Sequence, residues 1–433
     1  YPENPEAGID LFLEKLVQET EKEHEDILEQ ADETDAMFGE LYSWYLRNPE
    51  YRSRVQKLVQ SAFAGKPKDI ISQSVAKALY GEVSPYSATR LERFAACAFA
   101  HFLQYGMKLT ERVEYEFKPM DMGNVMHEAL ESFAEEVRKR GMKWTELTEQ
   151  ERNEIADRCL DNIVADYGNT VLKSSARNEY MIERTRRILR RTVWALQKQL
   201  EQGEFQPEGF EVTFGGGRID RVDIMEDQNK VYVKVIDYKT GNTSFDLVYL
   251  YHGLQLQLMI YLDGALRVEQ KKYPDKEIIP AGVFYYNIKD PMIQEKIDAD
   301  VEAVSAGLMK ELKMNGLVQA DPELVYRMDS SLGSIPVAFN KDGSFRKNSS
   351  VADRTQFAVL GRYVRTKIEK IRNSILEGDA EVSPYELGKK NACTYCPYMT
   401  VCGFDRRLSG YEFRRLKNFS DEELWKAFDR EAE

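Results

Sequence analysis

An acidic residue and a lysine, close together near the end of one strand, could hold a cation and activate water. The run V-Y-V-K-V-I-D-Y-K-T-G at 231–241 is rich in β-branched and aromatic residues, which predicts a buried strand ending at Asp237, Tyr238 and Lys239. Residues i and i+2 of a strand share a face, so Asp237 and Lys239 emerge side by side. A carboxylate binds hard divalent cations, and a neighbouring lysine can orient or deprotonate a water. For this triplet alone, the alternative is a strand-end salt bridge.

A second acidic stretch, Gly217–Asp223, precedes this strand and is separated from it by a short turn. If the two strands pair, Asp220 and Asp237 converge on one cation. Asp223 comes three residues after Asp220, so on a strand it faces the other way. We interpret Asp223 as a supporting residue or as half of a turn salt bridge.

Three further residues could complete such a site. His127 lies on a predicted helix at 123–139, where a neutral imidazole could be a third ligand or an ordinary core or surface histidine. Gln257 and Tyr261 are i and i+4 on a predicted helix at 247–266. They could hydrogen-bond a substrate phosphate or steady Lys239, or be a polar stripe on a core helix. Two carboxylates, a lysine and a single histidine favour a hard cation over zinc, which prefers more nitrogen or sulfur ligands.

The cysteines suggest a second metal centre. Cys393, Cys396 and Cys402 form C-x2-C-x5-C, and a four-thiolate centre would need one more ligand, for which Cys97 is the natural candidate. Zinc and an iron–sulfur cluster both accept four thiolates, so the residues alone leave the two open. Unligated buried thiols are the third alternative. Cys159 is expected to be a free buried thiol.

Composition limits the classes of function. The chain has 433 residues and a hydrophobic fraction of 42%, so two or three packed units are expected. Its net charge of −13 argues against a surface that binds nucleic acid nonspecifically. That net charge does not exclude a local basic face. One predicted helix carries four arginines at spacings of three or four residues, Arg184, Arg187, Arg190 and Arg191. They could contact DNA or simply be solvated. The sequence has no bilayer-length apolar run or signal-peptide pattern. The five cysteines suit a reducing compartment, and the start without Met suggests a piece of a longer protein.

The hydrophobic pattern predicts an α/β (α+β) fold with one small sheet. Strands are expected at 206–225, 230–238 and 278–288, and the main helices at 7–30, 36–64, 87–104, 123–139, 147–172, 178–201, 247–266, 351–376 and 421–431. We interpret 1–80 as a helical tail of a preceding domain or a linker, 81–409 as the functional domain with its core at about 120–290, and 410–433 as a C-terminal helix.

Together these motifs resemble the RecB-type branch of the PD-(D/E)XK nucleases: Asp220 in G-R-I-D, Asp237 to Lys239 in I-D-Y-K-T-G, His127 in G-N-V-M-H, and Gln257 with Tyr261. The segment Ser87…L-E-R-F…Cys97, followed by C-x2-C-x5-C, resembles the iron-staple version of that fold. That version occurs in the B subunit of AddAB-type helicase–nucleases (AddB) and in Cas4-like proteins. The segment from Ile335 to Tyr385 resembles AddB specifically.

The resemblance implies a restriction-endonuclease-like core, a small mixed sheet flanked by helices, with an iron–sulfur staple joining the N- and C-terminal parts. It implies a 4Fe–4S cluster on Cys97, Cys393, Cys396 and Cys402. It also implies Mg²⁺ at His127, Asp220, Asp237 and the main-chain carbonyl of Tyr238, with Lys239 catalytic and Gln257 and Tyr261 beside it. One departure is Ala98, where the family usually has proline after the first cysteine.

For function, the resemblance implies a bacterial cytoplasmic nuclease that acts in double-strand break repair by recombination. It would cut single-stranded DNA, on the 5′-terminated strand, fed by a helicase A subunit in a heterodimer. The region where the family recognises its recombination hotspot lies outside this chain. Two alternatives stay open: a catalytically silent DNA-binding scaffold for a helicase partner, and a stand-alone Cas4-like nuclease, against which the length and the missing start Met count.

Overall fold

The computed structural model describes residues 33–62, 70–81, 87–110, 119–166, 175–215, 217–293, 300–408 and 410–432. These residues fall into two compact units, each with a core of its own. Of the described residues, one unit contains 33–62, 70–79, 96–108, 375–408 and 410–417, and the other contains 80–81, 87–95, 109–110, 119–166, 175–215, 217–293, 300–374 and 418–432. The predicted helix at 7–30 lies outside the described residues. In the part of the chain that is described, we find no helix both long and apolar enough to cross a bilayer.

The larger unit, hereafter the sheet unit, is built on a mixed sheet. Six strands of the described residues form it in sequence order: β1 (Gln206–Phe214), β2 (Gly217–Asp227), β3 (Lys230–Lys239), β4 (Glu277–Asn287), β5 (Asn315–Gln319) and β6 (Val351–Ala352). β3–β4 and β5–β6 are parallel, and the other neighbours are antiparallel. The parallel step from β3 to β4 passes through helix α11 (Gln257–Lys272), as parallel pairing requires. The predicted α/β fold with a mixed sheet is confirmed.

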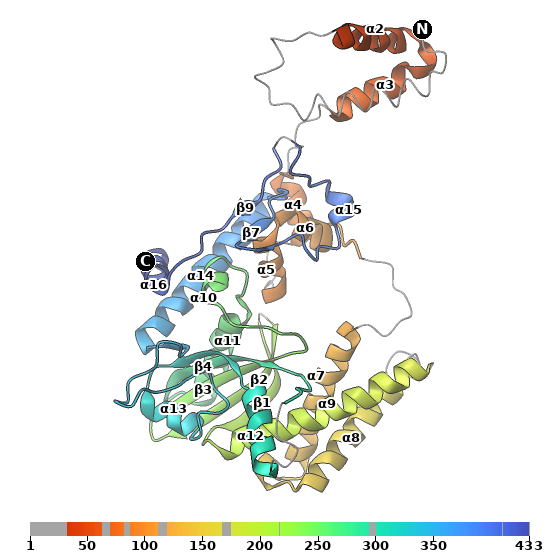
Figure 1. The fold of residues 1–433 in the computed structure, drawn as a ribbon. Helices are drawn as coiled ribbons and strands as arrows, with labels where there is room; N and C mark the ends of the chain where they lie inside the picture. The colour runs from red at the N-terminus through yellow and green to blue at the C-terminus, as the bar shows by residue number, and fades with distance from the viewer. Residues whose placement is uncertain are drawn as a thin grey trace. The chain divides into compact units, whose positions relative to one another are not determined.

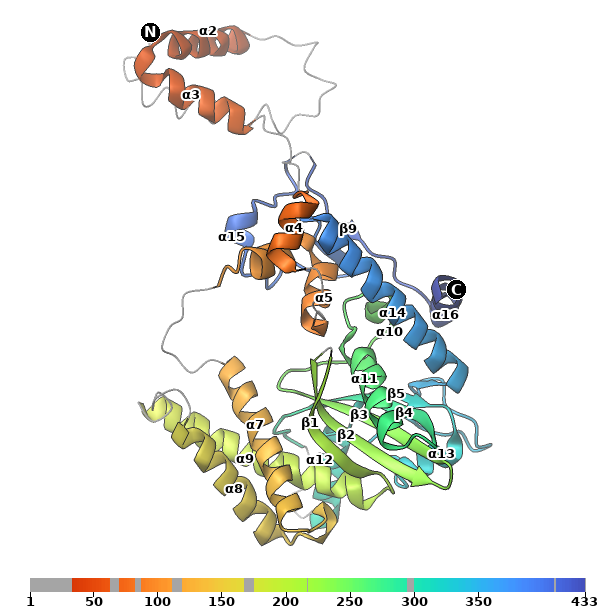
Figure 2. The ribbon, with the colours of Figure 1, turned by 180° about the vertical axis from the view of Figure 1, so that it is seen from behind.

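Helices cover both faces of this sheet (Figures 1 and 2). The alternate β3 residues Tyr232, Ile236 and Tyr238 join the main core with apolar side chains of α7 (Pro119–Lys139), α8 (Glu149–Asp166) and α9 (Ala176–Glu201). Helix α11 packs against β3 and β4. The other helices lying wholly or mainly in this unit are α5 (Ala88–Ala96), η2 (Trp144–Glu146), α10 (Leu247–Tyr251), α12 (Val301–Glu311), α13 (Pro322–Met328), α14 (Arg354–Glu377) and α16 (Asp421–Ala432).

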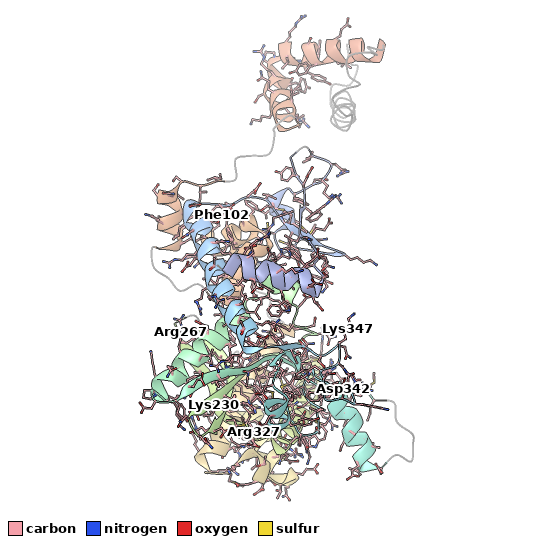
Figure 3. All side chains as sticks on the ribbon, turned by 90° about the vertical axis from the view of Figure 1, so that its left-hand side faces the viewer. Phe102, Lys230, Arg267, Arg327, Asp342 and Lys347 are labelled. Atoms are coloured by element: carbon pink, nitrogen blue, oxygen red, sulfur yellow. The ribbon has the colours of Figure 1, made fainter. Side chains whose placement is uncertain are left out.

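The predicted strand at 206–225 is wrong in one respect, because it is two strands. β1 and β2 form an antiparallel hairpin whose turn includes Gly215 and Gly217, the latter at φ +150°. Such a backbone conformation favours glycine. The pairing of β2 with β3 through a short turn is confirmed. That turn closes the end of the sheet where Lys230 and Arg327 are labelled in Figure 3, and Arg327 Nη1 lies 2.7 Å from Asp227 Oδ2.

Three predicted helices are interrupted, each for a local reason. The helix at 247–266 divides into α10 and α11, with Gly253 at φ +78° between them. The helix at 87–104 breaks at Cys97, whose backbone is extended at φ −165°. The helix at 36–64 is α2 (Glu33–Arg47) and α3 (Pro49–Ala62), because proline lacks the amide hydrogen that would continue a helix. Helix α7 confirms the predicted position of His127 on a helix.

The smaller unit, hereafter the cysteine unit, consists of short elements. After α2 and α3 they are α4 (Gln73–Tyr80), α6 (Ala98–His101), the π-helix η1 (Phe102–Gly106), β7 (Tyr385–Leu387), β8 (Lys390–Asn391), α15 (Met399–Cys402) and β9 (Arg414–Arg415). A small apolar cluster holds the cysteine-bearing part together, with Cys97, Ala100, Leu103 and Tyr398 buried in it. The predicted domain limits at residues 80 and 409 stay predictions.

Candidate active site

Three acidic side chains form a row across neighbouring strands at one end of the sheet. The β2–β3 ladder has Arg221 opposite Ile236, so the next position places Asp220 opposite Asp237. By the β1–β2 ladder, Glu211 is opposite Asp220. Opposed residues of paired strands project from the same face. The row therefore brings together one carboxylate from each of β1, β2 and β3.

His127, from α7, lies against this row. Its Nδ1 atom is 3.4 Å from Oδ2 of Asp220, and its ring meets the Tyr238 ring edge-on at 6.1 Å between centroids. The ligand atoms of His127, Glu211 and Asp220 lie within 4.8 Å of one another. The same Asp220 oxygen accepts the main-chain N–H of Tyr238 at 2.7 Å. The structure thus assembles the predicted His127 and Asp220 from different elements.

Lys239 is held between the row and helix α11. Its Nζ is 2.6 Å from Asp237 Oδ2 and donates to Gln257 Oε1 at 2.8 Å. Gln257 in turn donates to the hydroxyl of Tyr261 at 2.9 Å. The Lys239 ammonium also lies 5.5 Å from the centre of the Tyr285 ring. Of the three interpretations of Gln257 and Tyr261, this geometry agrees with the pair that steadies Lys239.

The site is electrostatically unfavourable without a cation. Burial, and then the Asp237 charge, raise the pKa of Asp220 well above its ordinary value. Burial also raises the pKa of Asp237, although Lys239 opposes that shift. Burial, and then Lys239, lower the pKa of His127, which favours the neutral imidazole that binds metals. A cation beside these carboxylates would offset the cost of ionising them.

Sequence reasoning missed Glu211. Its side chain is only 8% exposed and is ion-paired with Arg218. Burial is the main cause that raises its pKa. Its backbone has φ +50°, a conformation that non-glycine residues adopt rarely and that often marks a functional position. Because the pattern at 206–225 predicts one strand, nothing in it indicates that Glu211 faces Asp220 across a hairpin.

Asp223 lies on the opposite face of β2, as its three-residue offset predicts. Its oxygens accept from Arg221 at 2.6 and 2.9 Å, and Lys234 Nζ lies 3.1 Å away. All three side chains are almost fully buried. Asp223 does form a salt bridge, but within strand β2 and not in a turn as predicted.

Two of the four arginines of the predicted basic face on α9 are paired with acids. Arg187 donates to Asp290 at 2.6 Å, and Arg190 donates to Asp157 at 2.8 Å. Arg191 lies over the Trp194 ring at 5.2 Å. Arg184 is exposed. These pairs favour the solvated alternative, and the DNA-binding role of the four arginines stays a prediction.

The four predicted cysteine ligands line one cavity of the cysteine unit. Cys97, Cys393, Cys396 and Cys402 share its walls with apolar groups such as Phe99 and Tyr398. Burial is the main cause that raises the pKa of Cys393 to about 11, and the other three cysteines contribute. Among the described residues, no three cysteine sulfurs lie within 4.8 Å of one another. Cys159 is buried in the core of the sheet unit, as predicted.

Comparison with known proteins agrees with this geometry. Residues 85–403 match the model of the PD-(D/E)XK nuclease superfamily, and they include every strand of the sheet and all four cavity cysteines. The chain belongs to the PD-(D/E)XK nuclease superfamily. Within the superfamily, the chain is 41% identical over 425 residues to the B subunit of the ATP-dependent helicase/deoxyribonuclease from Lachnoclostridium phytofermentans. It is 34% identical over 425 residues to the protein of that name from a Thermoanaerobacter strain, and 33% identical over 423 residues to that of Clostridium acetobutylicum.

These matches cover 92–93% of this chain but only 36–37% of each relative. The chain therefore spans little more than a third of the length of the curated relatives. The PD-(D/E)XK match nevertheless contains the whole acidic row, His127 and the Lys239 cluster. The predicted recognition of the family is confirmed.

Proposed function

We propose that this chain is the nuclease domain of a helicase–nuclease B subunit and hydrolyses phosphodiester bonds of DNA with Mg²⁺. The observation that carries the proposal is the pairing of Asp220 with Asp237 across β2 and β3, with Lys239 ion-paired to Asp237. The names of the relatives, which are B subunits of helicase/deoxyribonucleases, support it. Residues of this chain fit the cation, because buried carboxylates and a neutral imidazole converge from three elements.

His127, Asp220, Asp237 and the main-chain carbonyl of Tyr238 would hold the Mg²⁺, with Glu211 beside them. When bound, the ion would polarise a phosphate oxygen and lower the pKa of a water. Lys239, with Nζ 2.6 Å from Asp237, would orient the attacking water or receive its proton. Gln257 would restrict the lysine to that position through the bond at 2.8 Å. The row of acids also repels phosphate in the absence of a cation, so cleavage would need the metal for binding as well as for chemistry.

The direct test is Asp237→Asn, which preserves shape while removing the charge. Cleavage of a labelled single-stranded DNA in Mg²⁺ should fall at least about 1,000-fold, with the circular dichroism spectrum unchanged. Glu226→Gln is the matched control, because Glu226 lies on β2 but pairs with Lys276 at the opposite end of the strand. Undiminished cleavage by Asp237→Asn would contradict the proposal. DNA retention without any Mg²⁺-stimulated cleavage by the wild type would instead favour the scaffold alternative.

We also propose a 4Fe–4S cluster on Cys97, Cys393, Cys396 and Cys402. The shared cavity supports a common centre, and its lining of apolar groups suits a buried cluster. Zinc and an iron–sulfur cluster both accept four thiolates, and the family resemblance favours the cluster. Iron analysis and a visible absorption spectrum test this, and zinc without iron would contradict it.

The rest of the proposed activity depends on parts outside this chain. A helicase A subunit would supply single-stranded DNA, and this domain would cut the 5′-terminated strand during recombinational repair in the bacterial cytoplasm. The printed names of the relatives support the helicase association. Parallel digestions of 5′- and 3′-labelled strands by the purified chain and by its complex with the helicase partner test the polarity. Equal degradation of both strands by the complex would contradict it.

A further inference from the structure

Glu92 connects helix α5 to the start of helix α11. Its Oε1 atom accepts the main-chain N–H groups of Leu256 at 2.7 Å and Gln257 at 2.9 Å. Those are the N-cap and first residue of α11, where N–H groups lack partners inside the helix. The N-cap side chain is a leucine, which offers no oxygen for capping. Glu92 therefore provides, from a distant part of the chain, the acceptor that a serine or aspartate usually supplies.

The capped residue is the one that holds the lysine. Gln257 receives the Glu92 bond through its backbone and accepts from Lys239 Nζ through its side chain at 2.8 Å. Gln257 is fixed further by Tyr261, one turn along α11. A shift of the α11 N-terminus would therefore move Gln257 and release Lys239 from its position beside Asp237. Displacements of about 1 Å in such contacts cost about 100-fold in rate.

We propose that Glu92 is a positioning residue of the nuclease site, which fixes Lys239 through the N-terminus of α11 and makes that placement depend on the Glu92 charge. The proposal rests on the proposed nuclease function. A carboxylate is a stronger acceptor for N–H groups than a neutral acid, and it interacts more favourably with a helix N-terminus. Protonation of Glu92 should therefore loosen the N-terminus of α11.

The surroundings of Glu92 bring its titration into the physiological range. Burial raises its pKa to about 7, against the two backbone bonds and the Lys239 charge, which lower it. The charged groups facing it from β3 are Lys239 and Asp237. Tyr285 of β4 and Tyr261 of α11 also face it, and both have pKa values raised mainly by burial, so they stay neutral near pH 7. Glu92 is thus expected to change charge as the pH crosses 7.

Two variants separate the acceptor from the charge. Glu92→Gln keeps an oxygen that can accept both N–H bonds but carries no charge, whereas Glu92→Ala removes the acceptor. With single-stranded DNA and saturating Mg²⁺, Glu92→Ala should lower kcat about 10- to 100-fold with little change in KM. The wild-type to Glu92→Gln ratio of kcat should be near one at pH 5.5 and rise several-fold through pH 7. Glu135→Gln is the control, because Glu135 is a half-exposed residue of α7 that pairs with Lys139.

The outcomes distinguish this inference from the proposed function. If the wild type cleaves, Asp237→Asn does not, and Glu92→Ala keeps the wild-type kcat, the positioning role is wrong while the nuclease stands. A flat kcat ratio between pH 5.5 and 8.5 would overturn the charge dependence.

A structural readout covers the case in which the wild type fails to cleave. The amide resonances of Leu256 and Gln257, including the Gln257 side-chain amide, should titrate with a midpoint near pH 7 in the wild type and not in Glu92→Gln. If the Gln257 side-chain amide does not respond, the inference is overturned whatever the enzyme does.

Discussion

The acidic row of the sheet unit and the cavity of the cysteine unit are both candidate metal centres, but they are built in opposite ways. The acidic row is set by ladders among three consecutive strands, supported by a large core on one face of the sheet. The cysteines sit on short elements around a small cluster of buried residues. In the sheet unit the fold positions charges that repel one another, whereas in the cysteine unit little apolar packing is available to hold the ligands.

This difference assigns opposite roles to the two proposed metals. A cation at the row would relieve a cost that the fold already bears, so the sheet should persist without it. A cluster at the cysteines would itself supply the cross-link between distant parts of the chain, so the cysteine unit should depend on it. One metal would serve chemistry and the other would serve folding.

The largest expected effect comes from removing the cluster. In Cys402→Ala we expect iron to be lost and backbone amides of residues 97–106 and 375–417 to exchange at least about 100-fold faster, because metal–thiolate binding of this kind contributes on the order of 10 kcal/mol to folding. Amides of β3 should keep their protection. Hydrogen exchange read by mass spectrometry checks both regions. Cys159→Ala removes a buried thiol of the sheet unit and should leave iron content unchanged. Equal loss of protection in both units would refute the contrast.

The parts of the site that follow from strand and helix periodicity could be predicted. The opposition of Asp220 to Asp237, the projection of Asp223 from the opposite face of β2 and the i, i+4 pair on α11 all follow from repeat distances of two and 3.6 residues. The grouping of Cys97 with the three later cysteines follows from the need of a four-thiolate centre for a fourth ligand, and from the family resemblance. The positions of Glu211 and Glu92 at the site could not be predicted from the sequence, for physical reasons. The first depends on a hairpin and a positive φ, and the second on contacts between residues 164 and 165 apart in sequence.

A second prediction contrasts two aspartates of the same strand. Asp223→Asn should destabilise the sheet unit by about 3–5 kcal/mol, because it leaves Arg221 and Lys234 buried without their counter-charge. Asp220→Asn should instead stabilise the metal-free protein by about 1 kcal/mol, because it removes a buried charge facing Asp237 while its amide oxygen still accepts from Tyr238. Urea unfolding at pH 8 in EDTA measures both. The same sign for the two variants would contradict the division of β2 into a structural and a functional face.

A third prediction concerns pH and Glu92. The folded pKa of about 7 exceeds the ordinary value of 4.5, so the native state binds this proton more tightly than the unfolded chain does. The associated stability is present below pH 4.5 and is lost as the pH rises through 7, up to on the order of 3 kcal/mol. Glu92→Gln avoids that loss. It should therefore be more stable than the wild type at pH 8, with the difference shrinking toward pH 5, in thermal unfolding at each pH. Equal pH dependence of the two proteins would show that the Glu92 carboxylate is well solvated.

The smallest expected effect concerns whether Glu211, the β1 member of the acidic row, contributes to cation binding. Glu211 lies within 4.8 Å of the ligand atoms of His127 and Asp220, yet it is held by Arg218. Because one carboxylate among several is removed and the neighbours remain, Glu211→Gln should weaken Mn²⁺ binding by about 10-fold, measured by calorimetry on the iron-loaded protein without DNA. Glu208→Gln is the matched control, since Glu208 is also on β1 but pairs with Lys272. Unchanged Mn²⁺ affinity in Glu211→Gln would show that residues of β2, β3 and α7 hold the cation without Glu211. The positive φ of Glu211 would then serve only to hold Arg218 at the edge of the site.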